Sequence, residues 1–265
     1  MMIRLVALDI DGTLLAPGVD AQAVPSAAMT QAVRELQEAG IVVALATGRM
    51  FPGTAHIARH LGITQPLICQ QGASVHESDG SLRHGCTIDE EIALELSDYA
   101  TSNSWPLAWF DAQRYLVTAH TAEAQHFADV SHIEMEIHPT PHQSGIRATG
   151  IDIISTREHA PDIHVLMEAR YGARITLLDF PSVTAVHAPE ASKGNALQRL
   201  AEELGIAREE VLALGDSVND VSMLSWAGHS AAPEHCDRYA RESVQQILPG
   251  DGVDGVVARL RSILD

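Results

Sequence analysis

Two aspartates, Asp9 and Asp11, stand where a short apolar run of the chain ends. The run begins at Ile3 and is rich in branched side chains, which is typical of a strand buried in a parallel sheet. Carboxylates are costly to bury unless something compensates their charge. Open α/β sheets bind ligands at the carboxyl ends of their strands, so the pair predicts a metal site there. The alternative is an ordinary turn, because Gly12 follows directly.

Further polar residues follow two other predicted strands. Thr47 comes directly after the apolar run 41–46, and Asp216 follows the run 211–214. Lys193 begins a predicted amphipathic helix in the second half of the chain. Because the carboxyl ends of parallel strands meet at one edge of a sheet, we expect these residues to converge with the two aspartates.

The chemistry that this set suggests is phosphoryl transfer. A carboxylate can attack phosphorus and form an aspartyl-phosphate, which divides one hydrolysis into two displacements. Asp9 and Asp216 could supply oxygens to Mg²⁺, an ion that prefers hard oxygen ligands. Thr47 and Lys193 could hold phosphate oxygens by hydroxyl and by charge. Asp11 could protonate the leaving oxygen and later deprotonate the attacking water.

Composition and charge exclude several classes of function. The formal charge of −18 comes from 35 acidic against 17 basic residues, and no cluster of Lys and Arg could replace the counterions of a nucleic acid. No apolar run approaches the roughly 20 residues of a membrane span, and no signal peptide is recognisable. We therefore expect a cytoplasmic monomer or homodimer with neither nucleic acid nor membrane as a partner.

Both ends of the sequence alternate predicted strands and helices. After the first strand come the helix 25–40, the strand 41–46, the helix 54–61 and the strand 66–69. The alternation returns late in the chain with the helix 193–204, the strand 211–214 and a final helix 253–264. This order predicts an α/β fold with a doubly wound, Rossmann-like parallel sheet.

The middle of the sequence has a different pattern. Predicted strands at 107–110, 115–118, 151–155 and 175–178 mix with helices at 90–100, 122–132 and 160–171. Such an order is typical of a separate α+β domain. We predict a core built from residues 1–80 and 183–265 and an inserted α/β cap domain over residues 81–182. The aromatic residues Trp109 and Phe110 are expected to pack inside the cap.

Four short motifs occur in order along the chain, namely Asp9–Leu14, Thr47–Arg49, Ser192–Gly194 and Gly215–Asp220. In this order, with a large insertion between the second and the third, they resemble the haloacid dehalogenase-like (HAD) hydrolase superfamily. The resemblance is specifically to the Cof-type phosphatases, which carry a large α/β cap, and it spans nearly the whole chain. Four motifs in order are far more specific than any one alone.

The resemblance implies a role for each motif residue. Asp9 would be the nucleophile and a magnesium ligand. Asp11 would be the general acid and base, and its backbone carbonyl would also bind the metal. Asp216 would complete the metal ligands, while Thr47 and Lys193 would hold the phosphate.

Further motif positions are implied to lie around these groups. Asn219 is expected near the phosphate, and Asp220 beside the metal ligands, where it would also orient the lysine. Gly12 and Gly48 would let backbone amides approach phosphate oxygens. For Arg49 two interpretations stay open, a contact with substrate or a salt bridge at the start of the following helix.

Two positions depart from the family pattern. Gln71 and Ser217 both stand where Asn is frequent in relatives. Neither departure removes a catalytic group, so both bear on the range of substrates.

The sequence thus predicts a Mg²⁺-dependent phosphatase that acts on a small phosphorylated metabolite, with sugar phosphates as the leading class. Closure of the cap would exclude bulk water from the reaction. One alternative is a phosphomutase of the phosphomannomutase type, which returns the phosphoryl group to its substrate. Another is a protein that binds phosphorylated metabolites without turnover.

Overall fold

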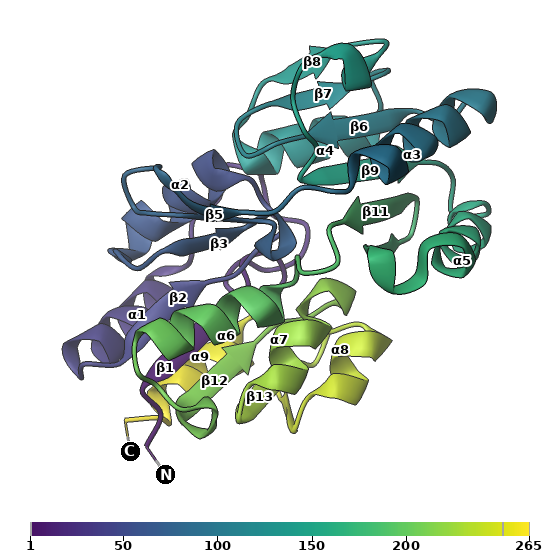
Figure 1. The fold of residues 1–265 in the computed structure, drawn as a ribbon. Coiled ribbons are helices and arrows are strands. Elements are labelled where there is room, and N and C mark those ends of the chain that lie inside the picture. Colours follow the sequence, from purple (N-terminus) through teal and green to yellow (C-terminus); the bar gives the residue numbers. More distant parts are fainter. Residues whose placement is uncertain (1, 251, 265) are drawn as a thin grey trace.

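The computed structural model describes residues 2–250 and 252–264. Its central sheet has the strand order β14-β13-β12-β1-β2, and every neighbouring pair runs parallel (Figure 1). These strands are β1 (Leu5–Leu8), β2 (Val42–Leu45), β12 (Val211–Leu214), β13 (His229–Pro233) and β14 (Gln246–Leu248). The predicted α/β fold with a parallel sheet is confirmed.

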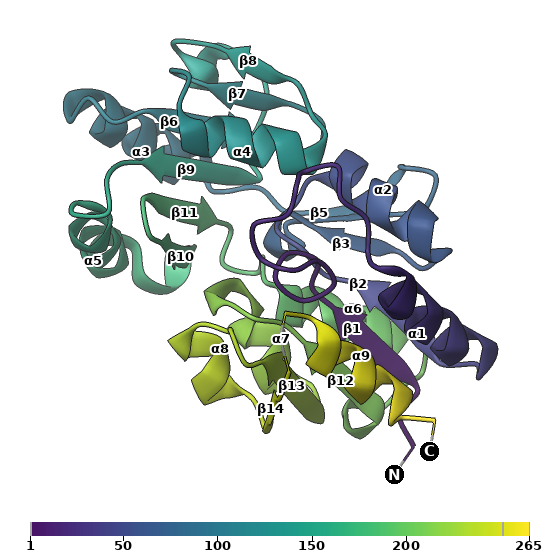
Figure 2. The same cartoon turned by 180° about the vertical axis from the view of Figure 1, so that it is seen from behind.

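Helices cover both faces of the central sheet, as the two opposite views show (Figures 1 and 2). One face carries α1 (Ala27–Glu38), α2 (Phe51–Leu61) and α9 (Asp254–Arg261), and the other carries α6 (Lys193–Glu203), α7 (Val221–Trp226) and α8 (Arg238–Ser243). In β1, Val6 and Leu8 pack into the first apolar layer, and Leu5 and Ala7 into the second. A strand buried on both faces needs apolar residues throughout, which explains the continuous run in the sequence.

A small antiparallel sheet adjoins the central sheet. The predicted strand 66–69 forms as β3 (Leu67–Cys69), and a parallel bridge joins Ile68 to Ala46 at the end of β2. β3 pairs with β4 (Ser74–His76), and β4 pairs with β5 (Leu82–Gly85). This small sheet lies beside the central sheet in Figure 1.

The inserted domain, called the cap below, contains a six-stranded sheet of order β10-β11-β9-β6-β7-β8. Its strands are β6 (Leu107–Phe110), β7 (Tyr115–Val117), β8 (Met135–Ile137), β9 (Gly150–Ile154), β10 (Thr176–Phe180) and β11 (Val183–His187). Its helices are α3 (Glu90–Ser102), α4 (Ala122–Ser131) and α5 (Ala160–Tyr171). α3 and α5 pack on the face that carries Ile151 and Ile153, and α4 packs on the opposite face with Phe110 and Ile154.

Sheet pairing departs from the predicted domain boundaries at both ends of the cap. β5 falls in the predicted cap segment 81–182 but pairs with β4 beside the core. β11 falls in the predicted core segment 183–265 but pairs with β9 and β10 in the cap sheet. The turn at 181–182, which suggests a boundary in the sequence, is the hairpin between β10 and β11.

We therefore propose revised boundaries. The amide of Cys86 still bonds to Ala73 on the core side, whereas the amide of Ile88 bonds to Ala148 in the cap. The chain thus enters the cap between Cys86 and Ile88, and it returns between the end of β11 and the start of α6. Four small residues at the two crossings form one buried cluster, Ala73, Cys86, Ala188 and Ala191.

Several elements at the end of the chain have no counterpart in the sequence-based prediction. They are the short helices α7 and α8 and the strands β13 and β14. Each has three to six residues, too few to produce a clear apolar period. Within 2–250 and 252–264, no helix is both long enough and apolar enough to cross a membrane.

Candidate active site

The register of three strands brings the first site residues together. Leu8 at the end of β1 pairs with Leu45 of β2 and with Leu214 of β12. The residues that follow these strands therefore lie at one edge of the sheet. The amide of Asp9 donates to the carbonyl of Leu214 at 3.0 Å, which brings Asp9 beside the loop that carries Asp216.

The start of α6 positions Lys193. Ser192 accepts a hydrogen bond from the amide of Asn195 at 3.1 Å, so it caps the helix, and Lys193 is the first helical residue. The fully buried Nζ of Lys193 donates to Oδ1 of Asp9 and to Oδ1 of Asp220, both at 2.6 Å. Burial by itself lowers the pKa of Lys193, but the two carboxylates outweigh it and raise the pKa, so the lysine stays charged.

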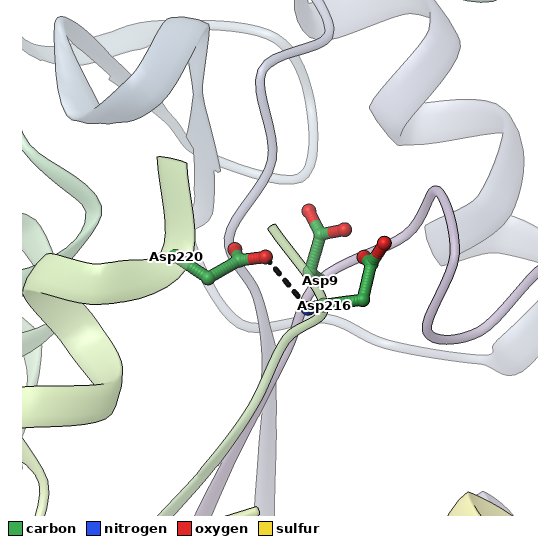
Figure 3. A group of neighbouring side chains, drawn as sticks. All are labelled: Asp9, Asp216 and Asp220. Atoms are coloured by element: carbon green, nitrogen blue, oxygen red, sulfur yellow. Dashed lines mark hydrogen bonds between the residues drawn. The ribbon is translucent and has the colours of Figure 1, made fainter. Parts of the chain in front are cut away.

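Asp220 holds both the lysine and the loop after β12. Its Oδ2 accepts hydrogen bonds from the backbone amides of Asp216 at 2.9 Å and Ser217 at 3.1 Å; the first is the dashed line in Figure 3. A Cβ at Gly215 would clash with the Asp220 side chain, so glycine permits this close approach. Protein donors thus occupy both oxygens of Asp220, and this residue positions the others.

Three carboxylates gather around this point, those of Asp9, Asp216 and Asp220, with ligand oxygens within 4.8 Å of one another (Figure 3). One buried lysine cannot balance three negative charges. Burial, then repulsion from the neighbouring carboxylates, raises the pKa of Asp9 and of Asp216 despite the attraction of Lys193. A divalent cation that prefers hard oxygen ligands fits the remaining carboxylate oxygens of Asp9 and Asp216 and would relieve the excess of charge.

Asp11 and Arg49 form a two-pronged ion pair at the edge of the site. Nε of Arg49 donates to Oδ2 of Asp11 at 2.7 Å, and Nη2 donates to Oδ1 at 2.5 Å. The Asp11 side chain is half exposed, whereas Arg49 is buried, and its Nη1 has no partner among the described residues. The Arg49 side chain therefore makes a salt bridge, as one of its two interpretations expects, and keeps a free donor.

Two of the three predicted metal ligands, Asp9 and Asp216, belong to the carboxylate cluster, and the third, Asp11, is predicted to bind through its backbone carbonyl. The structure groups the carboxylate of Asp220 with Asp9 and Asp216, while Arg49 holds the carboxylate of Asp11. The physical reason is that a guanidinium offers a planar pair of donors that matches a carboxylate. A metal contact through the backbone carbonyl of Asp11 stays a prediction.

The predicted phosphate-binding residues also lie around the site. Thr47 is buried, and its hydroxyl accepts a hydrogen bond from the amide of Arg49 at 3.2 Å. The side-chain amide of Asn219 donates to Oε1 of Gln71 at 3.2 Å, so the glutamine at the departing position contacts a motif residue. Gly12 has φ +86° and passes so close to Asp216 that a Cβ there would clash with its carboxylate.

A cavity of about 370 Å³ lies between the core and the cap. Core residues that line it are Asp9, Asp11, Thr47, Gly48, Arg49 and Asn219. Cap residues that line it include Phe110, Tyr115, Phe127, Asp152, Ile154 and His187. The cap thus faces the carboxylate cluster across a partly open cavity the size of a small metabolite.

Sequence reasoning missed most of the cap side of this cavity. Trp109 and Phe110 both pack inside the cap as predicted, but on opposite faces of its sheet, because successive side chains of β6 point to opposite faces, and Phe110 also borders the cavity. The sequence alone could have indicated Asp152 as a candidate site residue, because it is a charged residue within the apolar strand β9, where an unpaired charge is costly. No comparable signal marks His187.

The chain is similar to known proteins in both sequence and fold. Residues 6–260 match the family model described as haloacid dehalogenase-like hydrolase. The chain belongs to this family. Phosphatase YwpJ of Bacillus subtilis is 27% identical, and the match covers 92% of each chain. Phosphoglycolate phosphatase of Methanopyrus kandleri is 28% identical, with 100% of this chain and 98% of the relative covered.

The fold comparison agrees with the sequence comparison. A solved haloacid dehalogenase-like hydrolase from B. subtilis has a TM-score of 0.85 and 25% identity, covering 98% of this chain and 99% of its own. The predicted resemblance to Cof-type phosphatases with a large cap is confirmed. The chain is a phosphatase of this family that acts on phosphorylated small molecules.

Proposed function

We propose that this chain is a Mg²⁺-dependent phosphatase that hydrolyses phosphate monoesters of small metabolites through an aspartyl-phosphate on Asp9. The observation that carries the proposal is the environment of the Asp9 carboxylate. One of its oxygens accepts a hydrogen bond from Lys193, and the residue lines the cavity between core and cap. A related enzyme is named for phosphoglycolate, a small phosphorylated acid.

In the first step, the free carboxylate oxygen of Asp9 attacks phosphorus, and the bond from phosphorus to the leaving oxygen breaks. Lys193 and Thr47 hold the other phosphate oxygens, and Arg49, whose buried Nη1 has no partner among the described residues, lines the cavity beside them. Asp11 gives its proton to the leaving oxygen, so the alcohol departs neutral. This transfer requires Asp11 to release at least one of its hydrogen bonds from Arg49.

In the second step, water attacks the phosphorus of the aspartyl-phosphate. Asp11 accepts the proton of this water, inorganic phosphate leaves, and Asp9 returns to its carboxylate form. Mg²⁺ held by Asp9, Asp216 and the backbone carbonyl of Asp11 would offset the repulsion between the anionic nucleophile and the phosphate. Asp220 keeps Lys193 and the Asp216 loop in place through both steps.

The variant Asp9→Asn tests this proposal. We expect phosphate release to fall by at least about a thousandfold, because an amide cannot perform the attack. The fold should be retained, since removing one of three crowded carboxylates relieves repulsion. The control is Asp98→Asn on the exposed side of α3, which should turn over at the normal rate.

Phosphate release is measured in the presence of Mg²⁺, and mass spectrometry excludes deamidation of the asparagine back to aspartate. Turnover by Asp9→Asn near the normal rate would remove Asp9 as the nucleophile. The phosphomutase alternative predicts an isomerised sugar phosphate without release of inorganic phosphate. The non-catalytic alternative predicts binding with neither product.

A further inference from the structure

Asp152 is a buried carboxylate that the proposed reaction does not use. It lies in the middle of β9, between the apolar residues Ile151 and Ile153, and is 9% exposed. Its carboxylate accepts no hydrogen bond from any described residue, although it lines the cavity. Burial raises the pKa of Asp152 to about 7, which reflects the cost of an unpaired charge at this place.

The neighbouring strands leave the carboxylate open to the cavity. Asp152 pairs with Ala108 on β6 and with Ala185 on β11, and both neighbours end at a methyl group. Cross-strand neighbours of this size cannot cover an aspartate. The carboxylate is therefore accessible to a ligand while the surrounding protein supplies it with no donor.

An aromatic cluster forms the adjoining wall of the cavity. The ring centroids of Phe110 and Tyr115 are 5.7 Å apart, and that of Phe127 on α4 lies 5.4 Å from Phe110 and 4.9 Å from Tyr115. All three residues line the cavity together with Asp152. Phe110 and Tyr115 are almost fully buried, so the half-buried ring of Phe127 is the part of this cluster that can offer apolar area to a flat ligand.

The charge on the cap side of the cavity is negative. Among the described lining residues, the cap contributes the carboxyl groups of Asp152 and Glu123 and no Lys or Arg. The guanidinium of Arg49 belongs to the core side, where it binds Asp11.

His187 adds an acceptor and no positive charge. Its Nδ1 donates to the carbonyl of Thr149 at 3.0 Å, and burial lowers the pKa of this histidine to about 4, so its ring is neutral near pH 7. A neutral ring that donates through Nδ1 leaves Nε2 as an acceptor. Asp152, Glu123 and His187 therefore offer acceptors, and a ligand that binds them must bring the donors.

Resting on the proposed phosphatase function, we propose that Asp152 determines substrate specificity by binding an amino or ring N–H group on the organic part of the substrate. The preferred substrates are phosphate monoesters of a flat, nitrogen-bearing ring. This class replaces sugar phosphates, the leading class predicted from sequence, and disfavours esters that carry a second anionic group.

Three physical reasons support this class. A charge-assisted hydrogen bond from a protonated amine compensates a buried carboxylate better than a neutral hydroxyl does. A second anionic group near the cap would face Asp152 and Glu123 without a cation to balance it. A flat ring would bury one face against Phe127, whose own ring packs on Phe110 and Tyr115.

A matched pair of esters tests the proposal. Pyridoxamine 5′-phosphate and pyridoxine 5′-phosphate share one ring and one phosphate, and they differ in an aminomethyl against a hydroxymethyl group. We expect kcat/KM for the amine to exceed that for the alcohol by about ten- to a hundredfold, the range of a hydrogen bond to a charged group. In Asp152→Asn this ratio should fall to near one.

The control variant is Asp129→Asn, which removes one carboxylate from the exposed side of α4 and should keep the normal ratio. Glucose 6-phosphate and phosphoglycolate complete the panel, and both should be poorer substrates than the amine. Equilibrium binding of the matched pair to Asp9→Asn, with and without Asp152→Asn, gives a second readout that needs no turnover. Melting curves establish that each variant is folded.

The outcomes separate the two proposals. If no ester in the panel, nor p-nitrophenyl phosphate, releases phosphate in the presence of Mg²⁺, the proposed function fails. If phosphate is released but the amine has no advantage, or the advantage survives in Asp152→Asn, the role of Asp152 is overturned while the phosphatase stands. A preference for glucose 6-phosphate over the ring esters would also overturn it.

Discussion

Lys193 forms ion pairs with two carboxylates of the site, whereas Arg49 forms an ion pair with one. The lysine lies fully buried between Asp9 and Asp220, and both ion pairs measure 2.6 Å. Buried ion pairs add little net stability, because the loss of hydration offsets most of the attraction. What the arrangement provides is position, since a fixed ammonium beside the nucleophile needs no reorganisation when phosphate binds.

A first prediction at this scale concerns the stability of Asp152→Asn at different pH. The pKa of Asp152 is about 7 in the folded chain against 3.8 when unperturbed. Between these values the folded state binds the proton that the unfolded state has lost, so this group makes stability fall as pH rises. The penalty is complete above pH 7, where the asparagine variant should gain most.

Urea unfolding of both proteins at pH 5 and pH 8 measures the effect. We expect the stability advantage of Asp152→Asn to be larger at pH 8, by up to about 3 kcal/mol. The advantage of Asp129→Asn should not depend on pH in this way. An equal difference at both pH values would show that Asp152 is not an unpaired buried acid.

Residues in sequence motifs could be predicted, whereas residues placed by strand pairing could not. Asp9 directly follows its apolar strand and Asp216 comes one residue after its own, so both lie at strand ends that any parallel sheet brings to one edge. His187 reaches the cavity because β11 pairs with β9, a contact between strands that local sequence does not encode. The carboxylate of Asp11 is predicted to be the general acid and base, and nothing in the sequence indicates that the guanidinium of Arg49 binds it, as it does in the structure.

At the scale of elements, the N-terminus of α6 matters most for the reaction, because the helix starts at Lys193. We predict that Ser192→Ala lowers the free energy of unfolding by about 1 kcal/mol, the usual cost of losing an N-cap. It should also lower kcat, because the first turn holds the lysine. Chemical unfolding and phosphate release measure the two effects separately.

α1 offers a matched control for this cap. Ser26 accepts a hydrogen bond from the amide of Met29 at 3.2 Å, so it caps α1 in the same way, and it does not line the cavity. Ser26→Ala should lose similar stability and keep the normal kcat. Equal kcat values in the two variants would mean that capping does not position Lys193.

Elements with a clear apolar pattern were predicted closely. The strands 107–110 and 211–214 form with the expected bounds. The hairpin of β10 and β11 was missed because its Pro-Ser turn resembles a linker between domains. Local composition does not distinguish the two, since both need residues that favour a turn.

At the scale of the whole molecule, negative charge makes the proposed metal important for stability as well as for activity. The chain carries a formal charge of −18, and three carboxylates meet at the site. We predict that EDTA abolishes phosphate release and that Mg²⁺ restores it. Mg²⁺ at about 100 times its dissociation constant should add roughly 2.7 kcal/mol to the free energy of unfolding.

Asp216→Asn should lose most of this stabilisation, because it removes one proposed ligand. NaCl at matched ionic strength controls for general screening of the surface charge. Full activity in the chelator would contradict the proposed metal site. A rise in melting temperature that is equal in wild type and Asp216→Asn would place the ion elsewhere.

The inserted cap could be predicted because mixed strands and helices interrupt an alternating pattern, but its orientation depends on contacts distant in sequence. Gln70 shows this: its side-chain amide donates to the carbonyl of Asp111 at 2.6 Å and its oxygen accepts from the hydroxyl of Thr149 at 3.3 Å. These bonds join the core to the cap beside the cavity. A cytoplasmic location and a monomer or homodimer stay predictions.

The buried cluster of Ala73, Cys86, Ala188 and Ala191 has a consequence for how such enzymes diversify. The chain leaves the core and returns to it at one place, so the roughly one hundred residues between the two crossings form a domain that could be replaced as a unit. A different domain could be inserted there without changing the parallel sheet. A new cap could thus change the substrate while the residues of the core that react with phosphate stay the same.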